Sequence, residues 1–306
     1  KKSREQFETR TYKRLIDMLN SKKMVLSKYL YITPVSVFII VITIFPLVYS
    51  IYISTQDYQL ITQTSNFIGT NNFEESLEDK RFKESLFTTL KIGFPSLIFE
   101  TLFGLGLALI LSSIKTQRGI ITSLLATPVL IAPSAIAMSF KMLYTPEWGP
   151  LNHILGIPLG KVLEIDWLGD PQIAPIAVII ADVWQWSPFV MLIVLAGLLS
   201  IPTEIYEASR IDGASGWNSF RYITLPLISF PLTVAIILRS IDLFKLFDLP
   251  YIMSQGGPAG STETVTIYTY LVGIRFFRVG YGAALSIMLL LVVIIVSKFL
   301  VKYTNK

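Results

Sequence analysis

Long apolar stretches alternate with short polar segments along this chain. Six of these stretches approach the roughly 20 residues that a helix needs to cross a bilayer core. Because backbone groups inside a bilayer find no water, each stretch is expected to be helical. The expected spans are Tyr31–Ile53, Leu86–Leu111, Ile120–Met142, Ile173–Leu199, Leu227–Phe247 and Ala283–Leu300. The pattern predicts an all-α, polytopic membrane protein with six transmembrane helices.

Two polar connections carry further structural signals. Asn66–Ser85 mixes acidic and basic side chains, and we expect a short helix there outside the membrane. Thr145–Asp170 is rich in glycine and proline, and its Trp148 and Trp167 suit the interfacial belt of a membrane protein. Prolines inside the spans predict helix breaks that neighbouring helices or a cavity must compensate. These prolines are Pro95, Pro128, Pro133, Pro188 and Pro231.

Residues 1–28 have a different character, with nine Lys or Arg and three acidic residues. Phe7, Leu15 and Leu19 are among apolar residues at loose helical spacing, which indicates a basic amphipathic segment on the membrane surface. A solvated tail is the alternative. We expect no cleaved signal peptide, because the basic stretch is too long and no small-residue cleavage site follows the first apolar run. The predicted organisation is a cytoplasmic segment, 1–30, followed by a six-helix transmembrane domain, 31–306.

Composition supports a membrane protein and excludes other classes. Of 306 residues, 52% are apolar and only 15% are charged, against about 25% charged in an ordinary soluble domain. This balance excludes a disordered chain and argues against a soluble enzyme. The chain has no cysteine and a single histidine, His153, so we expect no disulfide and no metal site built on these ligands.

The net charge of +5 reflects membrane topology rather than nucleic-acid binding, because the basic residues are unevenly placed. With the N-terminus inside, the cytoplasmic segments hold sixteen Lys or Arg and the external segments hold six. Most of this difference comes from residues 1–28. The positive-inside rule then places both termini in the cytoplasm, and we expect no nucleic-acid partner.

The loop at residues 200–226, between the fourth and fifth spans, has the signals of a compact helical hairpin. Pro202 opens a helix and Gly213 follows its end, which matches the usual asymmetry of helix termini. Ser215 is suited to cap a second short helix. The loop is therefore expected to be ordered and compact.

One turn of this hairpin has the properties of a docking surface. Ala208 and Ser209 are expected on an exposed turn, where small side chains let another backbone approach closely. Glu207 adds a charge for a cation on a partner. A hairpin that packs only on its own chain is the alternative.

The loop also resembles a known signature. The residues that carry the likeness are Glu207-Ala208-Ser209-x3-Gly213-x9-Ile223-x-Leu225-Pro226. This stretch resembles the EAA loop of ABC importer permeases, with Ser209 where the usual pattern has a second alanine. The resemblance implies a coupling helix that fits a cleft in a cytoplasmic ATPase, with coupling residues Glu207, Ala208, Ser209, Asp212 and Gly213.

Other stretches narrow the resemblance to carbohydrate importers of the maltose and glycerol-phosphate type. They are Phe67-Ile68-Gly69, Trp148–Asn152, Trp167–Pro171, Asp182–Phe189, Gly256-Gly257-Pro258 and Tyr281–Ala284. The resemblance implies the ABC importer permease fold in a bacterial or archaeal cytoplasmic membrane. It also implies a carbohydrate substrate, a second permease subunit (expected to be a related chain, with a copy of this one as the alternative), two cytoplasmic ATP-binding subunits and an extracytoplasmic solute-binding protein.

Ionisable groups inside spans cost roughly 2.5–3.5 kcal/mol each on insertion scales and usually face a partner or a cavity. Such groups are Glu100, Asp182, Arg239 and Asp242. Aromatic and polar groups together suit a sugar, whose C–H face stacks on rings while its hydroxyls form hydrogen bonds. Gln185, Trp186 and Phe189 follow Asp182 at i+3, i+4 and i+7, so all four are expected on one helix face. The expected path residues are Gln185, Trp186, Phe189, Arg239 and Asp242. A structural Arg239–Asp242 pair with Trp186 as packing is the alternative.

The expected substrate is a neutral or mildly acidic oligosaccharide, and an acidic glycan or a glycerophosphate is the alternative. If Arg239 and Lys245 are free, they favour an acidic glycan or a glycerophosphate. If Asp242 neutralises Arg239, the site suits a neutral oligosaccharide.

The chain shows no nucleotide-binding or catalytic motif. It has no Gly-x4-Gly-Lys-Ser/Thr sequence and no plausible nucleophile–base constellation. We therefore expect a transport subunit without catalytic residues or a cofactor of its own, with ATP and Mg²⁺ bound by the partner ATPase. An ATP-independent secondary carrier is the rival class, but it leaves the docking loop unexplained.

Overall fold

The computed structural model describes residues 29, 32–62, 64–161 and 163–304. The chain divides into two units, Lys1–Ile53 and Ser54–Lys306. The first unit contains all but the last residue of an apolar helix that begins at Ile32 and ends at Ser54. The basic segment predicted for residues 1–28 and the boundary predicted at residue 30 lie outside the described residues.

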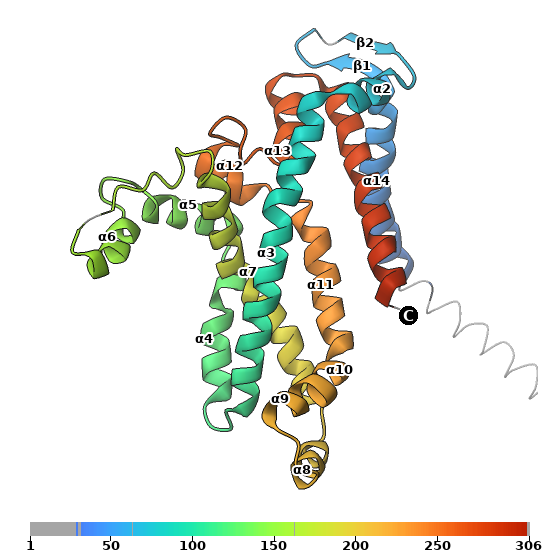
Figure 1. The fold of residues 1–306 in the computed structure, drawn as a ribbon. Coiled ribbons are helices and arrows are strands. Elements are labelled where there is room, and N and C mark those ends of the chain that lie inside the picture. Colours follow the sequence, from blue (N-terminus) through green and yellow to red (C-terminus); the bar gives the residue numbers. More distant parts are fainter. Residues whose placement is uncertain (1–28, 30–31, 63, 162, 305–306) are drawn as a thin grey trace, which may run out of the picture. The chain divides into compact units, whose positions relative to one another are not determined.

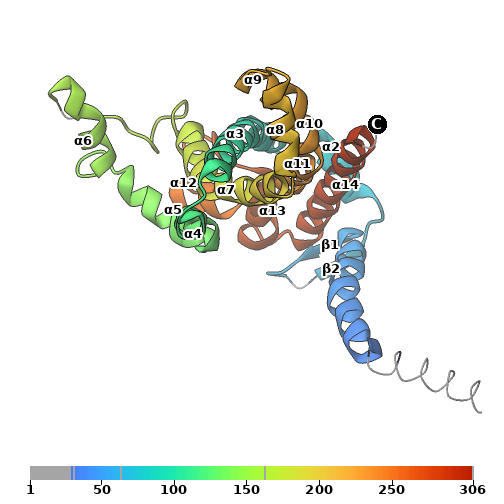
Figure 2. The same ribbon diagram turned by 90° about the horizontal axis from the view of Figure 1, so that it is seen from below.

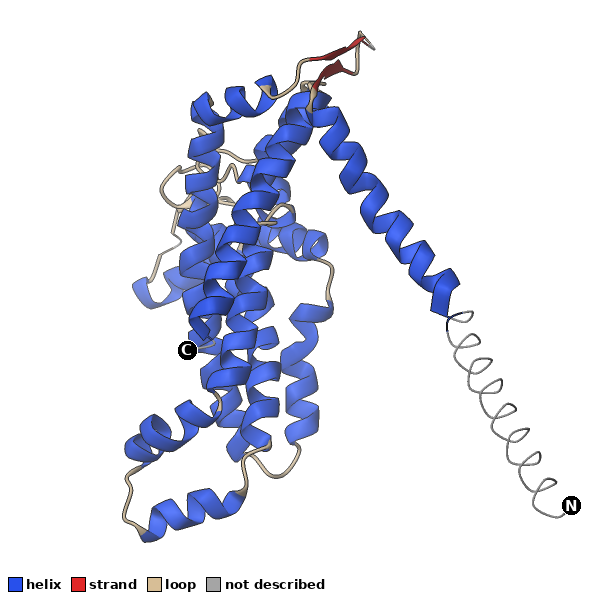
Figure 3. Cartoon of the chain, turned by 90° about the vertical axis from the view of Figure 1, so that its right-hand side faces the viewer, coloured by secondary structure: helices blue, strands red, loops and turns tan. Residues whose placement is uncertain are grey.

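The second unit is built mainly of helices (Figures 1 and 3). It begins with an antiparallel hairpin of β1 (Gln56–Gln59) and β2 (Thr64–Phe67), in which Gln56 lies opposite Phe67. The helices that follow are α2 (Asn71–Glu78), α3 (Lys80–Ser113), α4 (Arg118–Leu130), α5 (Pro133–Leu143), α6 (Pro150–Gly156), a 3-10 turn (Ile157–Leu159), α7 (Ala174–Leu199), α8 (Thr203–Ile211), α9 (Gly216–Ser219), a π-helical turn (Phe220–Thr224), α10 (Leu225–Leu227), α11 (Ser229–Leu243), α12 (Asp248–Ser254), α13 (Val265–Tyr270), a second π-helical turn (Leu271–Arg275) and α14 (Val279–Thr304).

The predicted all-α membrane architecture is confirmed. Among the described residues, four helices are long and apolar enough to cross a membrane, namely Ile32–Ser54, α3, α7 and most of α14. Two bent pairs raise the number to six if each pair forms one span: α4 with α5, bent by 90°, and Gly216–Leu227 with α11, bent by 65°. The short helix predicted within Asn66–Ser85 is α2, and α3 begins at Lys80, before the expected start of the second span.

The prolines break fewer helices than predicted. Pro95 lies within α3 and Pro188 within α7, and both helices continue through them. The chain does break before Pro133, the first residue of α5, where a proline costs no helical hydrogen bond. The break before α11 falls at Ile228 rather than at Pro231.

Helices α3 and α7 pack closely in the second unit, with α11 beside them (Figure 2). Gly104 of α3 permits the approach, since a Cβ atom there would lie 2.6 Å from Cβ of Val190. Buried apolar side chains then join α3 and α7 to α11, including Ala108, Val194 and Ala235. The α8 end of this unit lies opposite the end that carries α2 and the hairpin (Figure 1).

The loop after α5 folds back and buries one of its tryptophans. Trp167 is only 9% exposed, its Nε1 donates to Asn152 Oδ1 at 2.8 Å, and its ring stacks on Tyr144. Trp148 is 63% exposed. The interfacial-belt prediction is therefore wrong for Trp167, because the loop provides it with a polar partner inside the protein.

Candidate functional site

A buried cluster of three charged side chains joins α3, α7 and α11. Arg239 donates from Nε to Glu100 Oε2 at 2.7 Å and from Nη2 to Glu100 Oε1 at 2.6 Å. Its Nη2 also donates to Asp182 Oδ2 at 3.2 Å. Arg239 is 2% exposed, and both carboxylates are fully buried. Because unpaired charges are costly away from water, each of these groups depends on the others to remain inside the protein.

Arg239 also covers an aromatic ring. Its guanidinium carbon lies 4.6 Å from the ring centroid of Trp186, a cation–π contact. Asp182 and Trp186 are four residues apart on α7, so they lie on the same helix face. One turn of α7 thus supplies Arg239 with both a counter-ion and a stacking surface.

A cavity of about 230 Å³ lies beside this cluster, bordered by α7, α11 and α12. Its lining combines the ring of Trp186 with charged side chains, namely Asp182, Arg239, Asp242, Lys245 and Asp248. Small-molecule sites usually measure about 300–1,000 Å³. In this conformation the cavity is therefore smaller than a typical small-molecule site. We call it the Trp186 cavity.

The structure brings together three of the five predicted path residues. Trp186, Arg239 and Asp242 line the Trp186 cavity, whereas Gln185 and Phe189 are not among its lining residues. Gln185 is fully buried, and its Nε2 donates to the Ile131 carbonyl oxygen at 3.3 Å, in the break between α4 and α5. This contact satisfies a backbone group that the break frees from its helix.

Phe189 serves the packing of α7. Its ring meets that of Trp186 edge to face at 6.1 Å, and it packs against the apolar cluster shared by α3, α7 and α11. Helical spacing alone placed it on the same face as Trp186. Residues of α11 and α12 form the rest of the cavity wall, and Phe189, one turn of α7 beyond Trp186, lies outside the lining.

The alternative of an Arg239–Asp242 pair is not what the structure shows. Asp242 pairs instead with Lys245, Oδ1 to Nζ at 2.7 Å, in a half-exposed ion pair. Sequence reasoning missed Glu100 as the main partner of Arg239. The available signal was its position as a lone acid within an apolar span, which required a cation from another helix.

The α8 hairpin has the predicted form. Helix α8 is Thr203–Ile211, and Ser215 Oγ caps α9 by accepting from Asn218 N at 3.3 Å. Gly213 adopts φ +76°, while Gly213 N and Ala214 N donate to the Arg210 and Ser209 carbonyls. This is a Schellman ending, which favours glycine at the left-handed position.

The side chains of the hairpin divide between surface and interior. Glu207, Ala208, Asp212 and Gly213 are exposed. Ser209 is 7% exposed and its Oγ donates to the Tyr206 carbonyl at 2.9 Å, so the prediction that it lies on the exposed turn is wrong. Its small side chain is needed inside the hairpin rather than on the surface.

At the opposite end of the unit, which carries the β1–β2 hairpin, one carboxylate forms hydrogen bonds with three helices. Asp79 Oδ1 caps α3 by accepting from the backbone N–H groups of Arg81 and Phe82. Its Oδ2 accepts from the hydroxyls of Tyr268 at 2.5 Å and Tyr281 at 2.7 Å. Burial acts to raise the pKa of Asp79, but these four hydrogen bonds outweigh it and hold the pKa below its ordinary value.

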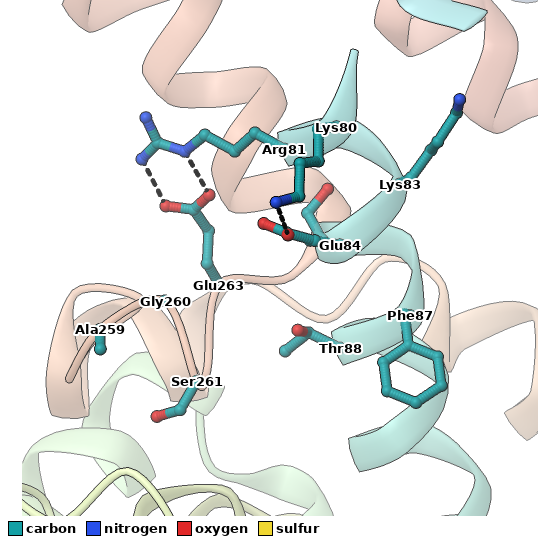
Figure 4. A pocket seen from close by; sticks show the side chains of 11 residues that line it. Lys80, Arg81, Lys83, Glu84, Phe87, Thr88, Ala259, Gly260, Ser261 and Glu263 are labelled. Atoms are coloured by element: carbon teal, nitrogen blue, oxygen red, sulfur yellow. Dashed lines mark hydrogen bonds and ion pairs between the residues drawn. The ribbon is translucent and has the colours of Figure 1, made fainter. Parts of the chain in front are cut away.

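A wider pocket, about 960 Å³, lies between the start of α3 and the loop before α13, and several charged side chains line it (Figure 4). Arg81 forms a bidentate ion pair with Glu263, at 2.8 and 2.7 Å. Lys80 lies 3.7 Å from Glu84. Such an open, charged surface suits contact with a polar protein surface more than enclosure of an apolar ligand.

Comparison with known proteins identifies the family. The sequence pattern of binding-protein-dependent transport system inner membrane components matches residues 100–306. The chain belongs to this family. A second pattern, that of ribosomal protein S10p/S20e, matches residues 1–38 only and covers too little of the permease to show a relationship. The predicted transport permease is confirmed, and the protein is a membrane-embedded component of a transport system.

Curated relatives extend the match over most of the permease. The trehalose/maltose transport system permease protein MalF of Thermococcus litoralis is 36% identical over 270 residues, which are 88% of this chain and 90% of that protein. The trehalose transport system permease protein SugA of Mycobacterium tuberculosis is 30% identical over 278 residues, covering 90% and 87%.

Solved structures share the fold. The crystal structure of a bacterial ABC transporter involved in the import of the acidic polysaccharide alginate contains a chain that is 20% identical, with a TM-score of 0.78. The match covers 90% of this permease and 94% of that chain. The predicted ABC importer permease fold is thereby confirmed.

Proposed function

We propose that this permease moves an oligosaccharide across the cytoplasmic membrane by alternating access. The observation that carries the proposal is the Trp186 cavity, where an aromatic ring and several carboxylates meet between α7, α11 and α12. Rings stack on the C–H faces of sugars, and carboxylates accept hydrogen bonds from hydroxyls. The names of the relatives, which are trehalose and maltose permeases, support the same class of substrate.

The energy for transport comes from separate subunits in this proposal. Two cytoplasmic ATP-binding subunits, which hold ATP and Mg²⁺, dock on the inner face of the permease pair. One of them contacts α8 of this chain through Glu207, Ala208, Asp212 and Gly213, all of which are exposed. Closure of the ATPases moves the α8 hairpin. The membrane helices then switch between two states with different affinity for sugar. A second, related permease completes the translocation path.

The same proposal orients the permease. The α8 end faces the cytoplasm, together with both chain termini, as the positive-inside rule favours. The end that carries the β1–β2 hairpin, with the pocket around Arg81 and Glu263, faces outward and receives the solute-binding protein. This orientation places the charged pocket where a soluble partner delivers the substrate.

The experiment is reconstitution of the permease with its co-purifying partners in liposomes. ATP hydrolysis and uptake are measured with the binding protein and a panel of neutral oligosaccharides, uronate oligosaccharides and glycerophosphates. Stimulation by a sugar supports the proposal. If an ATPase binds but no carbohydrate stimulates it, the carbohydrate assignment is wrong. If no ATPase co-purifies, an ATP-independent carrier takes its place.

A matched pair of variants tests the coupling role of α8. Glu207→Gln is expected to reduce sugar-stimulated ATP hydrolysis at least tenfold, because the charge that faces the ATPase is lost. Glu204→Gln removes another exposed acid, from the first turn of the same helix, and is expected to leave coupling within about twofold. Equal behaviour of the two variants would show that Glu207 has no special role.

A further inference from the structure

Both cationic side chains that line the Trp186 cavity are already paired within the permease. Arg239 makes its bidentate contact with Glu100, a third contact with Asp182, and is 2% exposed. Lys245 lies 2.7 Å from Asp242. An anionic ligand would have to compete with a carboxylate of the protein for either cation.

Acidic groups outnumber basic groups around the cavity. Three carboxylates, those of Asp182, Asp242 and Asp248, line the cavity together with the two cations, and the carboxylate of Glu100 pairs with Arg239. Asp248 is exposed and forms no ion pair with a described residue. The formal charge of this set is negative, and repulsion between like charges is strongest where water is scarce.

The free hydrogen-bonding capacity of the cavity lining also favours hydroxyl donors. The carboxylate of Asp248 lines the cavity, is exposed, and forms no ion pair with a described residue. An ionised carboxylate only accepts hydrogen bonds. A sugar hydroxyl can donate to it, whereas a uronate or phosphate group presents further acceptors and a like charge.

We propose that the Trp186 cavity selects uncharged sugars and rejects anionic ones, with Asp242 and Asp248 as specificity-determining residues. This inference rests on the proposed carbohydrate function and adds the charge class of the substrate. Asp242 contributes in two ways, because it repels an anion directly and keeps Lys245 occupied. It is also only partly buried, with its side chain 40% exposed, so it is accessible to an arriving ligand.

The test measures binding to the complete purified transporter without the binding protein, so that delivery does not impose the selectivity. The probes are a neutral trisaccharide and the same trisaccharide oxidised at one primary hydroxyl to a uronate, each titrated by calorimetry. Wild type is expected to bind the neutral probe at least tenfold more tightly. Asp242→Asn frees Lys245 and is expected to narrow this ratio about tenfold.

Two control variants give the opposite or no effect. Lys245→Gln leaves Asp242 without its cation, so the preference for the neutral probe is expected to persist or grow. Glu164→Gln removes an exposed acid that does not line the cavity and is expected to leave the ratio unchanged. Assembly with the ATPase and basal ATP hydrolysis check that each variant is folded.

The outcomes separate this inference from the proposed function. Charge selection by this cavity is wrong if wild type takes up neutral sugar but binds both probes equally. It is also wrong if Asp242→Asn and Lys245→Gln shift the ratio of the two probe affinities in the same direction. In both cases the carbohydrate function stands. Uptake of neutral sugar without detectable binding of the neutral probe also overturns it. If no carbohydrate is taken up, the proposed function itself fails.

Discussion

The buried cluster of Glu100, Asp182 and Arg239 allows a prediction about stability in which the magnitude follows from the geometry. Arg239→Met removes the only described cation within ion-pair distance of two fully buried carboxylates. Breaking a buried ion pair by removing one partner costs about 3–5 kcal/mol, because the remaining charge is left uncompensated. At about 2–4 °C per kcal/mol for a chain of this size, the unfolding midpoint is expected to fall by about 6–20 °C.

Two further variants separate the cost of stranded charge from the cost of lost packing. Glu100→Gln keeps an acceptor for Arg239, and Asp182 still balances its charge, so about 1–3 kcal/mol is expected. The triple variant Glu100→Leu, Asp182→Leu, Arg239→Met leaves no charge unpaired. Replacing a buried ionic set by apolar groups of similar size is often neutral or stabilising, so this variant is expected to unfold near the wild-type midpoint.

The assay is thermal unfolding of the purified transporter, followed by intrinsic fluorescence, with sugar uptake measured in parallel. The triple variant is expected to be stable but altered in uptake, because Arg239 and Asp182 also line the Trp186 cavity. If Arg239→Met unfolds within 2 °C of wild type, the carboxylates are not stranded and the reasoning is refuted. If the triple variant is as unstable as the single one, packing rather than charge explains the loss.

Two more outcomes follow from the structure. Gly104→Ala would place a Cβ 2.6 Å from Val190 Cβ and 2.8 Å from a backbone oxygen, so about 1–3 kcal/mol of destabilisation is expected. Gly106→Ala, with open space around it, should be neutral or stabilising. Equal unfolding midpoints for the two variants would contradict close packing of α3 on α7 at Gly104. The pKa of Asp79 lies below its ordinary value of 3.8, so its stabilising effect is complete above about that pH and is lost as the pH falls through the folded-state pKa. Unfolding midpoints of wild type and Asp79→Asn should therefore differ at pH 7 and converge progressively as the pH is lowered below about 3.8, and a constant difference would contradict this.

Local signals predicted the helical architecture well, and the reason is that they act within a few residues. Apolar length decides whether a segment can span a bilayer, and the bounds of α7 differ from the predicted Ile173–Leu199 by one residue. The Schellman ending at Gly213 and the cap at Ser215 likewise depend only on neighbouring backbone groups. The burial of Ser209 does not, because it depends on how the hairpin closes.

The candidate site was predicted less completely, since its contacts join residues far apart in the chain. Arg239 and Glu100 are 139 positions apart, and helical spacing offered Asp242 as a nearer partner for Arg239. Gln185 was predicted to line the substrate path but contacts the Ile131 carbonyl at the α4–α5 break. The position of that break relative to α7 is a property of packing that periodicity does not contain.

The sequence by itself determined the class of protein, the order of its spans, the form of the α8 hairpin and the residues that carry the family resemblance. These features follow from hydrophobicity, helix termini and spacing along one chain. Only the tertiary structure decided which charges neutralise one another, which path residues line a common cavity and which side of the hairpin remains exposed. Those outcomes depend on which residues of separate helices come to lie beside one another. A buried charge is stabilised by whichever opposite charge lies within reach and not by the nearest one in sequence.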